Sequence, residues 1–219
     1  MIQETDLSNF KVLMIYPNQR TVSLVPPSLA LFSSLLKERN AEVKLFDTTF
    51  YRMDCDDSDK AREKNLTVHP VNENSLVIEY NNGDVFEDLC KLVEDFRPNI
   101  ILATATDSTF PLALDLFRAV QKYKSQYNFL TLLGGVFATF APERSISYPE
   151  IDVICVGEGE GPLIDICDRM RKGEQYDDVL NLWVKTKDGK VIKNRVRPPA
   201  NISELPPPDF SIFDEKRLY

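Results

Sequence analysis

The sequence predicts a doubly wound α/β fold, flavodoxin-like or Rossmann-like, built on a five-stranded parallel sheet. Five short apolar runs alternate with segments whose apolar residues recur at helical spacing. The runs are continuous stretches of Val, Ile and Leu, which is typical of parallel strands that helices cover on both faces. In such sheets a ligand site lies at the carboxyl ends of the strands, near the switch in strand order.

The first half of the chain supplies two strands and two helices. Residues 11–16 (KVLMIY) and 41–47 (AEVKLFD) predict strands, and residues 28–40 between them predict a helix that is apolar nearly all round. Residues 84–96 predict an amphipathic helix, which Asp84 can cap.

The second half continues the same alternation, and Pro111 suits the first turn of a helix. The elements expected in chain order are a strand at 99–105, a helix at 111–123, a strand at 128–133, a short helix near 142–147, a strand at 151–156 and a helix at 161–173. We therefore expect residues 1–179 to form one α/β domain.

Three further segments depart from this alternation. Residues 48–83 are polar, with one strand-like piece at 75–80, and we expect an insertion packed on the sheet edge. Residues 180–197 predict a β-hairpin appendage around an Asp-Gly turn. Residues 198–219 are rich in proline and are expected to form an extended linker. We therefore expect the chain to stop at a domain boundary, with a second domain downstream.

The composition excludes several classes of protein. The net charge of −8 argues against a nucleic-acid partner, because nucleic-acid modules normally carry a basic face. No apolar run reaches membrane-spanning length and the first residues lack the features of a signal peptide, so we expect a cytoplasmic protein without a membrane partner. The four cysteines show no CxxC spacing, and the one histidine is His69, in the polar insertion. We therefore expect no catalytic residue and no metal ligand in this chain.

Glycines and small hydroxyl side chains follow three of the expected strands. They occur in TATDSTFP (104–111), GGVFATF (134–140) and GEGEGP (157–162). Each has an ordinary explanation, since glycines make tight turns, Thr and Ser cap helices, and acidic residues with proline begin them. Their occurrence together at equivalent places favours a ligand. The loop at 17–28 contains no glycine, so the G-x-G-x-x-G fingerprint of dinucleotide binding is missing, as are a Walker loop and the acids of a phospho-acceptor receiver domain.

With these segments in register, the chain resembles the N-terminal cobalamin-binding domain of cobalamin-dependent radical S-adenosylmethionine enzymes. The resemblance covers nearly the whole chain. The segments that carry it, in order, are VLMIYPN with VPPSLALFSSLLK, then RPNIILATATDST, LLGGVFATFAPE, IDVICVGEGEGPL, a DG hairpin and LPPPDFSIFDEKRLY. Their order and spacing together are specific, although no single segment is.

The resemblance implies a cobalamin whose nucleotide tail runs down between the strands, with the corrin over their carboxyl ends. Glycines suit that contact, because a bulky ligand approaches the backbone only where side chains are missing. Glu158 is expected to accept hydrogen bonds from amide groups of the cofactor. The cofactor-binding residues that the resemblance implies are Asn18, Thr104, Thr106, Ser108, Gly134, Gly135, Val136, Phe137, Gly157, Glu158 and Gly159.

Two motifs of related proteins are missing from this chain. The D-x-H-x-x-G signature, which gives cobalt a histidine in many cobalamin-binding domains, is absent, so we expect no protein imidazole on the metal. The CxxxCxxC motif is also absent. The resemblance therefore implies that S-adenosylmethionine and a 4Fe–4S cluster are held by a downstream radical barrel, and that this segment alone does not perform the radical reaction, often a methyl transfer.

Three alternatives stay open at the level of sequence. The chain could be a stand-alone cobalamin carrier or sensor, although the linker-like ending FDEKRLY favours a module of a longer enzyme. It could be an interaction domain whose crevice has lost its ligand. The basic residues of the hairpin could contact RNA, although such charges usually mark a solvated surface.

Overall fold

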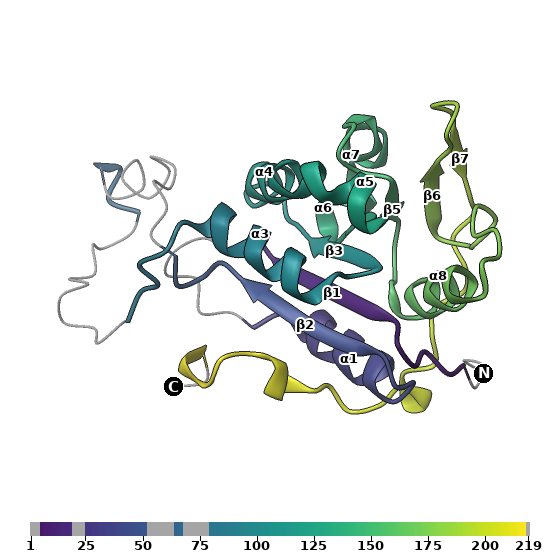
Figure 1. Ribbon diagram of the computed structural model, residues 1–219, viewed down its shortest axis with the longest axis horizontal. Helices are drawn as coiled ribbons and strands as arrows, with labels where there is room; N and C mark the ends of the chain where they lie inside the picture. Colours follow the sequence, from purple (N-terminus) through teal and green to yellow (C-terminus); the bar gives the residue numbers. More distant parts are fainter. Residues whose placement is uncertain (1–4, 19–24, 52–63, 68–78, 218–219) are drawn as a thin grey trace.

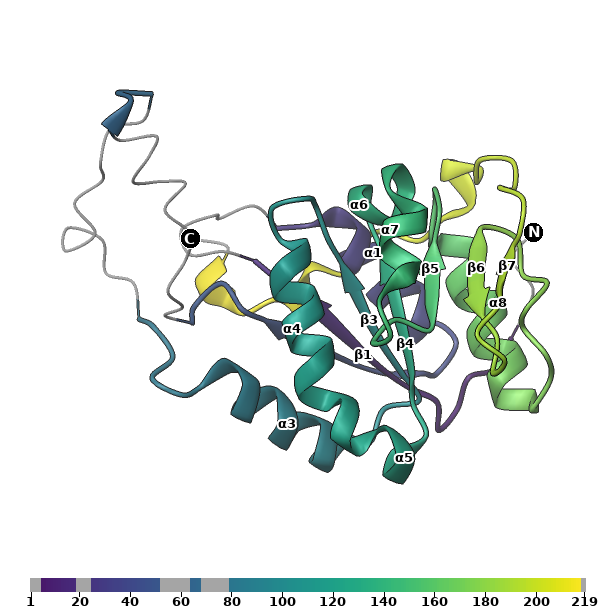
Figure 2. The ribbon, with the colours of Figure 1, turned by 90° about the horizontal axis from the view of Figure 1, so that it is seen from above.

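The computed structural model describes residues 5–18, 25–51, 64–67 and 79–217. Within these residues one mixed sheet runs through the molecule, with helices on both of its faces (Figures 1 and 2). The expected strand-like piece at 75–80 lies mostly outside the described residues, and His69 and Cys55 lie wholly outside them.

The five expected parallel strands are confirmed. They are β1 (Lys11–Tyr16), β2 (Glu42–Asp47), β3 (Ile100–Thr104), β4 (Leu130–Gly134) and β5 (Val153–Cys155). The order across the sheet is β2-β1-β3-β4-β5-β6-β7, so the strand order switches between β1 and β3. Parallel pairing brings the carboxyl ends of β3, β4 and β5 to one edge, with Thr104 opposite Gly134.

The hairpin extends the sheet, so the described sheet has seven strands rather than five. Strand β6 (Leu182–Lys185) pairs antiparallel with β5, and β7 (Val191–Lys193) pairs with β6 (Figure 2). The side chains of Leu182 and Val184 are buried in the core and the two residues between and after them are half-exposed. This alternation lets the hairpin cover the backbone of β5, which would otherwise be a buried edge with unpaired groups.

The helices form two layers (Figure 1). Helices α1 (Pro27–Lys37) and α8 (Glu160–Lys172) cover one face of the sheet. The other face is covered by α3 (Val85–Phe96), α4 (Phe110–Val120), α5 (Lys124–Tyr127), α6 (Val136–Phe140) and α7 (Pro142–Ser147). Asp84 caps α3 as expected, because its carboxylate accepts hydrogen bonds from the backbone N–H groups of Phe86 and Glu87. Helix α6 was not expected from the sequence.

The proline-rich segment after the hairpin contains three short 3-10 helices, η3 (Ile202–Glu204), η4 (Phe210–Ile212) and η5 (Glu215–Arg217), and it is docked on α1. The Ser33 hydroxyl donates to the Asp209 carboxylate at 2.7 Å, and the Asp209 N–H donates to the Ala30 carbonyl at 3.0 Å. Farther along, the buried Arg217 donates to the Thr49 hydroxyl at 2.7 Å. Figure 1 draws this segment as the yellow ribbon beneath α1. The C-terminal part of the described chain therefore packs on the α/β domain.

Candidate functional site

A missing side chain opens a pocket on the face of the sheet that α1 and α8 cover. Side chains alternate along a strand, so Gly134 faces the same side of β4 as Leu132. A Cβ atom at Gly134 would have one neighbour within 4 Å, the Ala103 carbonyl oxygen at 4.0 Å. The space above Leu132 is therefore open, and it forms part of a cavity of about 190 Å³.

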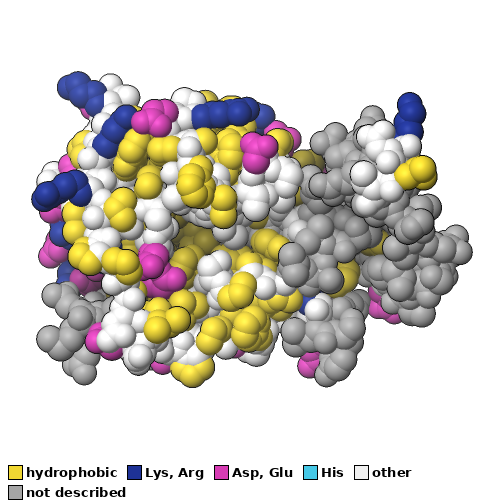
Figure 3. All heavy atoms as spheres, turned by 180° about the vertical axis from the view of Figure 1, so that it is seen from behind, with side chains coloured by type: hydrophobic (Ala, Val, Ile, Leu, Met, Phe, Trp, Pro, Cys, Tyr) yellow, Lys and Arg dark blue, Asp and Glu magenta, His cyan; other side chains and the backbone are white. Residues whose placement is uncertain are grey.

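This pocket has a mostly apolar lining with some polar groups and glycines. Figure 3 shows the face of the molecule opposite to that of Figure 1, where hydrophobic side chains lie at the bottom of a hollow with acidic side chains beside it. The apolar lining residues are Phe32, Leu102, Ala103, Leu132, Cys155, Pro162, Leu163 and Leu182. The polar and glycine lining residues are Ser28, Thr104, Gly134, Gly135, Gly157, Glu158, Gly159 and Glu160. A flat, mostly apolar group with a polar end fits this arrangement.

Gly135 has a different role from Gly134. Its φ is +91°, and a Cβ atom there would lie 2.6 Å from the Thr104 hydroxyl and 2.8 Å from the backbone of Ala105. The residue after it begins α6, whose Phe137 N–H donates to the Ala105 carbonyl at 3.0 Å. Gly135 is therefore required by the close approach of two segments of the chain itself.

Thr139 joins the two glycine loops at the mouth of the pocket. Its hydroxyl donates to the Gly135 carbonyl at 3.0 Å and accepts from the Gly157 N–H at 3.1 Å. Gly157 itself has a φ of +87°, which favours glycine. Sequence reasoning missed Thr139, because its partner lies on another loop.

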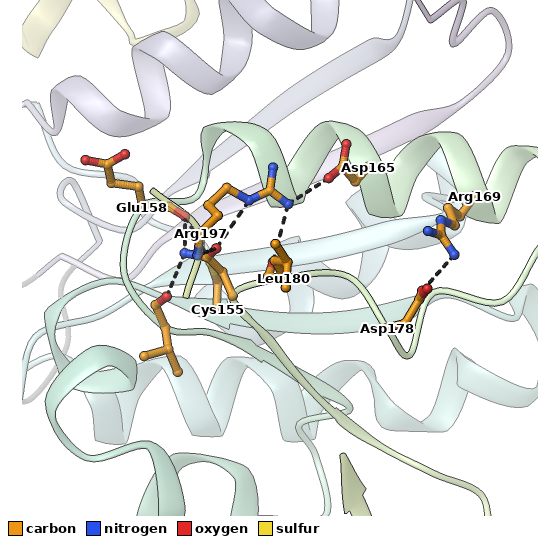
Figure 4. A network of polar contacts seen from close by, with 9 residues as sticks. Cys155, Glu158, Asp165, Arg169, Asp178, Leu180 and Arg197 are labelled. Atoms are coloured by element: carbon orange, nitrogen blue, oxygen red, sulfur yellow. Dashed lines mark hydrogen bonds and ion pairs between the residues drawn. The ribbon is translucent and has the colours of Figure 1, made fainter. Parts of the chain in front are cut away.

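Asn181, between α8 and β6, holds the loop between β5 and α8 through hydrogen bonds to its backbone. Figure 4 shows Glu158 of that loop beside Arg197. Asn181 is 1% exposed, and its side-chain amide donates to the carbonyls of Val156 at 2.9 Å and Glu158 at 3.2 Å. Its Oδ1 accepts from the Arg197 N–H at 3.0 Å, and the Arg197 guanidinium donates to Asp165 at 2.7 Å. These hydrogen bonds connect the chain on either side of the hairpin to the loop between β5 and α8. The φ of Asn181 is +72°, a conformation that Asn tolerates better than most residues.

The structure brings six of the predicted site residues together as lining of the pocket: Thr104, Gly134, Gly135, Gly157, Glu158 and Gly159. Three others lie at the same edge of the sheet and do not line it. Thr106 and Ser108 belong to an exposed hydroxyl cluster before α4, with their hydroxyl oxygens 3.0 Å apart. Val136 is 59% exposed on α6.

Asn18 and Phe137, also predicted as site residues, lie in contacts that hold the fold together. Asn18 is buried, and it donates from its backbone N–H to Thr48 and from its side chain to Thr49, each at 2.8 Å. These bonds join the ends of β1 and β2. Phe137 is buried on the opposite face of the sheet from the pocket, where its ring stacks on Phe110 with centroids 4.2 Å apart.

Cys155 contributes a neutral thiol to the pocket wall. Burial raises the pKa of this thiol to about 12, and the nearby charge of Glu160 acts in the same direction. The thiol donates to the Glu158 carbonyl at 3.6 Å. Cys155 therefore serves as an apolar lining group rather than as a nucleophile.

Two further observations concern the described residues as a whole. They contain no group of three or more His, Cys, Asp or Glu side chains that could hold a metal ion. None of their helices is long and apolar enough to cross a membrane.

Residues 66–166 match the sequence profile of the family described as the B12 binding domain. This part of the chain is therefore similar to a B12-binding domain. The matched range runs from before α3 into α8 and so includes the glycine loops after β4 and β5. Helix α1 and the hairpin, which also line the pocket through Phe32 and Leu182, lie outside it.

Curated relatives of this chain include methyltransferases. An uncharacterised methyltransferase of Pyrococcus horikoshii is 31% identical over 130 residues, which are 58% of this chain and 28% of that protein. The cytidylyl-2-hydroxyethylphosphonate methyltransferase of Streptomyces wedmorensis is 22% identical over 76% of this chain and 28% of its own length. The chain therefore spans less than a third of the length of these relatives.

Solved structures share the fold of this chain. The cobalamin-dependent S-adenosylmethionine radical enzyme OxsB, with aqua-cobalamin and S-adenosylmethionine bound, matches 94% of this chain and 25% of its own, with 21% identity and a TM-score of 0.66. The radical S-adenosylmethionine methyltransferase TsrM from Kitasatospora setae, with cobalamin and a 4Fe–4S cluster bound, matches 90% of this chain and 31% of its own. Its identity is 16% and its TM-score 0.62.

Proposed function

We propose that this chain is the cobalamin-binding module of a radical S-adenosylmethionine enzyme, and that the complete enzyme transfers a methyl group. The observation that carries the proposal is the cradle at Gly134, which opens an apolar pocket at the carboxyl edge of a B12-binding domain. Relatives that are methyltransferases support the second part. When bound, cobalamin supplies a cobalt centre that can carry a methyl group.

In this proposal different pocket residues contact different parts of the cofactor. The apolar bottom, including Leu132 and Leu163, buries the aromatic base of the nucleotide tail and keeps water from it. Gly134 leaves the backbone bare where the tail passes. Thr104 and Ser28 offer hydroxyls to the polar part of the tail nearer the mouth.

The edge of the sheet outside the pocket receives the macrocycle in this proposal. Val136 and Phe140 project from α6 there, 59% and 84% exposed, and give it an apolar contact. The hydroxyls of Thr106 and Ser108 face the amide side chains of its rim. The S-adenosylmethionine and the 4Fe–4S cluster belong to a further domain, because no CxxxCxxC motif occurs in this chain.

A titration tests the first part of the proposal. The chain is mixed with hydroxocobalamin in rising ratio and passed through a gel-filtration column, with absorbance followed at the protein and at the corrin bands. We expect the pigment to elute with the protein at a ratio of one to one. Pigment that elutes entirely with small molecules, while circular dichroism shows the α/β fold, overturns the proposal.

A further inference from the structure

The two glutamates of GEGEG, two residues apart, occupy different surroundings. Glu158 is exposed, and its carboxylate accepts a hydrogen bond from the Ala200 N–H at 2.8 Å. Glu160 is only partly exposed and is the first residue of α8. Glu158 is therefore engaged by the proline-rich segment, and Glu160 is left to the pocket that both residues line.

The carboxylate of Glu160 lacks a proton donor. Its Oε2 atom is shielded from solvent and accepts no hydrogen bond from the described residues. The nearest pocket thiol, that of Cys155, donates elsewhere, to the Glu158 carbonyl. A shielded carboxylate oxygen without a donor is costly, and a carboxylate can only accept hydrogen bonds. Rotation about the last side-chain bond exchanges its two oxygens, so either can receive a donor from the pocket.

The chemistry of the nucleotide tail decides which of its groups meets Glu160. The tail runs from the base through a ribose to a phosphodiester and then to the corrin. An anionic phosphodiester is repelled by a carboxylate, and the base belongs in the apolar bottom of the pocket. The ribose lies between these two parts and carries free hydroxyls. These hydroxyls are the donors on the tail that lie nearest to a base buried in the pocket.

We infer that Glu160 recognises the ribose hydroxyl of the nucleotide tail, and that it makes the pocket prefer complete cobalamins to corrinoids without a tail. The inference rests on the proposed function. It makes Glu160 a specificity-determining residue, and it leaves Glu158 as a residue that anchors the segment after the hairpin.

Binding of two corrinoids to three variants tests the inference. Hydroxocobalamin and diaquacobinamide, which lacks the tail, are titrated into the wild-type chain and into Glu160→Ala, Glu160→Gln and Glu174→Gln, with the corrin bands as the readout. A hydrogen bond to a charged acceptor predicts about a 10- to 100-fold weaker cobalamin affinity for Glu160→Ala and a smaller loss for Glu160→Gln. Affinity for cobinamide should stay at the wild-type value. Glu174→Gln, the matched control, changes an exposed residue after α8 that does not line the pocket, so it should bind both corrinoids as the wild type does.

The outcomes separate this inference from the proposed function. An equal loss of cobalamin and cobinamide affinity in Glu160→Ala overturns the inference, because the contact then lies on the corrin side. Unchanged cobalamin affinity overturns it as well. Both results leave the wild-type affinity for cobalamin, and with it the proposed function, intact. A wild-type chain that binds neither corrinoid overturns both. Glu160→Gln has nearly the same shape as the native residue, so its circular dichroism controls for folding.

Discussion

Replacing Gly134 by valine should close the pocket without disturbing the fold. The nearest atom to a Cβ at this position is 4.0 Å away, which is ordinary van der Waals contact, and Gly134 has no positive φ. Valine also suits a strand better than glycine does. We therefore expect the free energy of unfolding to be unchanged or to rise by roughly 0.5–1 kcal/mol.

The cost to binding follows from what the valine displaces. An aromatic group buries about 150–250 Å² of surface, worth about 4–6 kcal/mol at about 25 cal/mol per Å². If the base can no longer enter, the dissociation constant for cobalamin should rise at least about 10³-fold. Gly134→Ala adds a single carbon atom and should show a smaller loss.

The assay pairs a stability measurement with a binding measurement. Thermal unfolding followed by circular dichroism reports the fold, and co-elution of hydroxocobalamin in gel filtration reports binding. Glu42→Thr, which places a β-branched residue on the exposed side of β2 away from the pocket, is the matched control and should bind like the wild type. Wild-type affinity in a well-folded Gly134→Val variant would refute the reasoning, because the base would then bind elsewhere.

Three further predictions follow from other parts of the structure. Gly135→Ala should lower the free energy of unfolding by about 2 kcal/mol or more, because a φ of +91° is strained for alanine and its Cβ would meet the Ala105 backbone at 2.8 Å. The change should appear as a lower midpoint of unfolding in urea. A midpoint at the wild-type value would contradict this. Burial acts to raise the pKa of Asp209, but hydrogen bonds from Lys37, Ser211 and Ser33 outweigh it and hold the pKa below the ordinary 3.8. A depressed pKa stabilises the fold above pH 3.8, and this stabilisation is lost as the pH falls below that value, so stability should fall more steeply on acidification below about pH 4 in the wild type than in Asp209→Asn; equal slopes would argue against it. The cob(II)alamin-loaded chain should give electron paramagnetic resonance lines without nitrogen splitting, because the proposed pocket takes the tail base away from cobalt and His69, the one histidine, is outside the sequence segments that line the pocket. Triplet splitting that disappears in His69→Ala would show that this histidine ligates cobalt, and splitting that persists would show that the tail base does.

The sequence predicted the strands well because each strand is a local pattern. Continuous runs such as residues 11–16 carry their own evidence of burial on two faces, and Asp84 marks the start of α3 by a local hydrogen bond. The hairpin was also predicted, but not its place in the sheet. That place depends on Leu182 filling the core beside β5, which is a contact between distant segments.

The sequence predicted those parts of the site that depend on a local pattern, and it missed those that depend on contacts between distant segments. Glycine is informative wherever it occurs in a strand, so Gly134 was found from the sequence. The face of the sheet on which a residue near Gly134 packs depends on the rest of the fold and cannot be predicted from the local sequence. Phe137 was expected at the cofactor, and it turns instead toward Phe110 because α4 lies above it. Phe32 and Glu160 were missed as pocket residues because α1 and the start of α8 meet only in the folded chain.

Helix α1 has two engaged sides. One side gives Ser28 and Phe32 to the wall of the pocket, and the other holds the proline-rich segment through Ser33 and Lys37. A helix is a stiff rod, so the two sides move together. Tension applied to the segment would therefore be transmitted through α1 as a change in the width of the pocket. The proline-rich segment and the pocket are thus mechanically coupled, and a force on the segment would set how far apart the walls of the pocket lie.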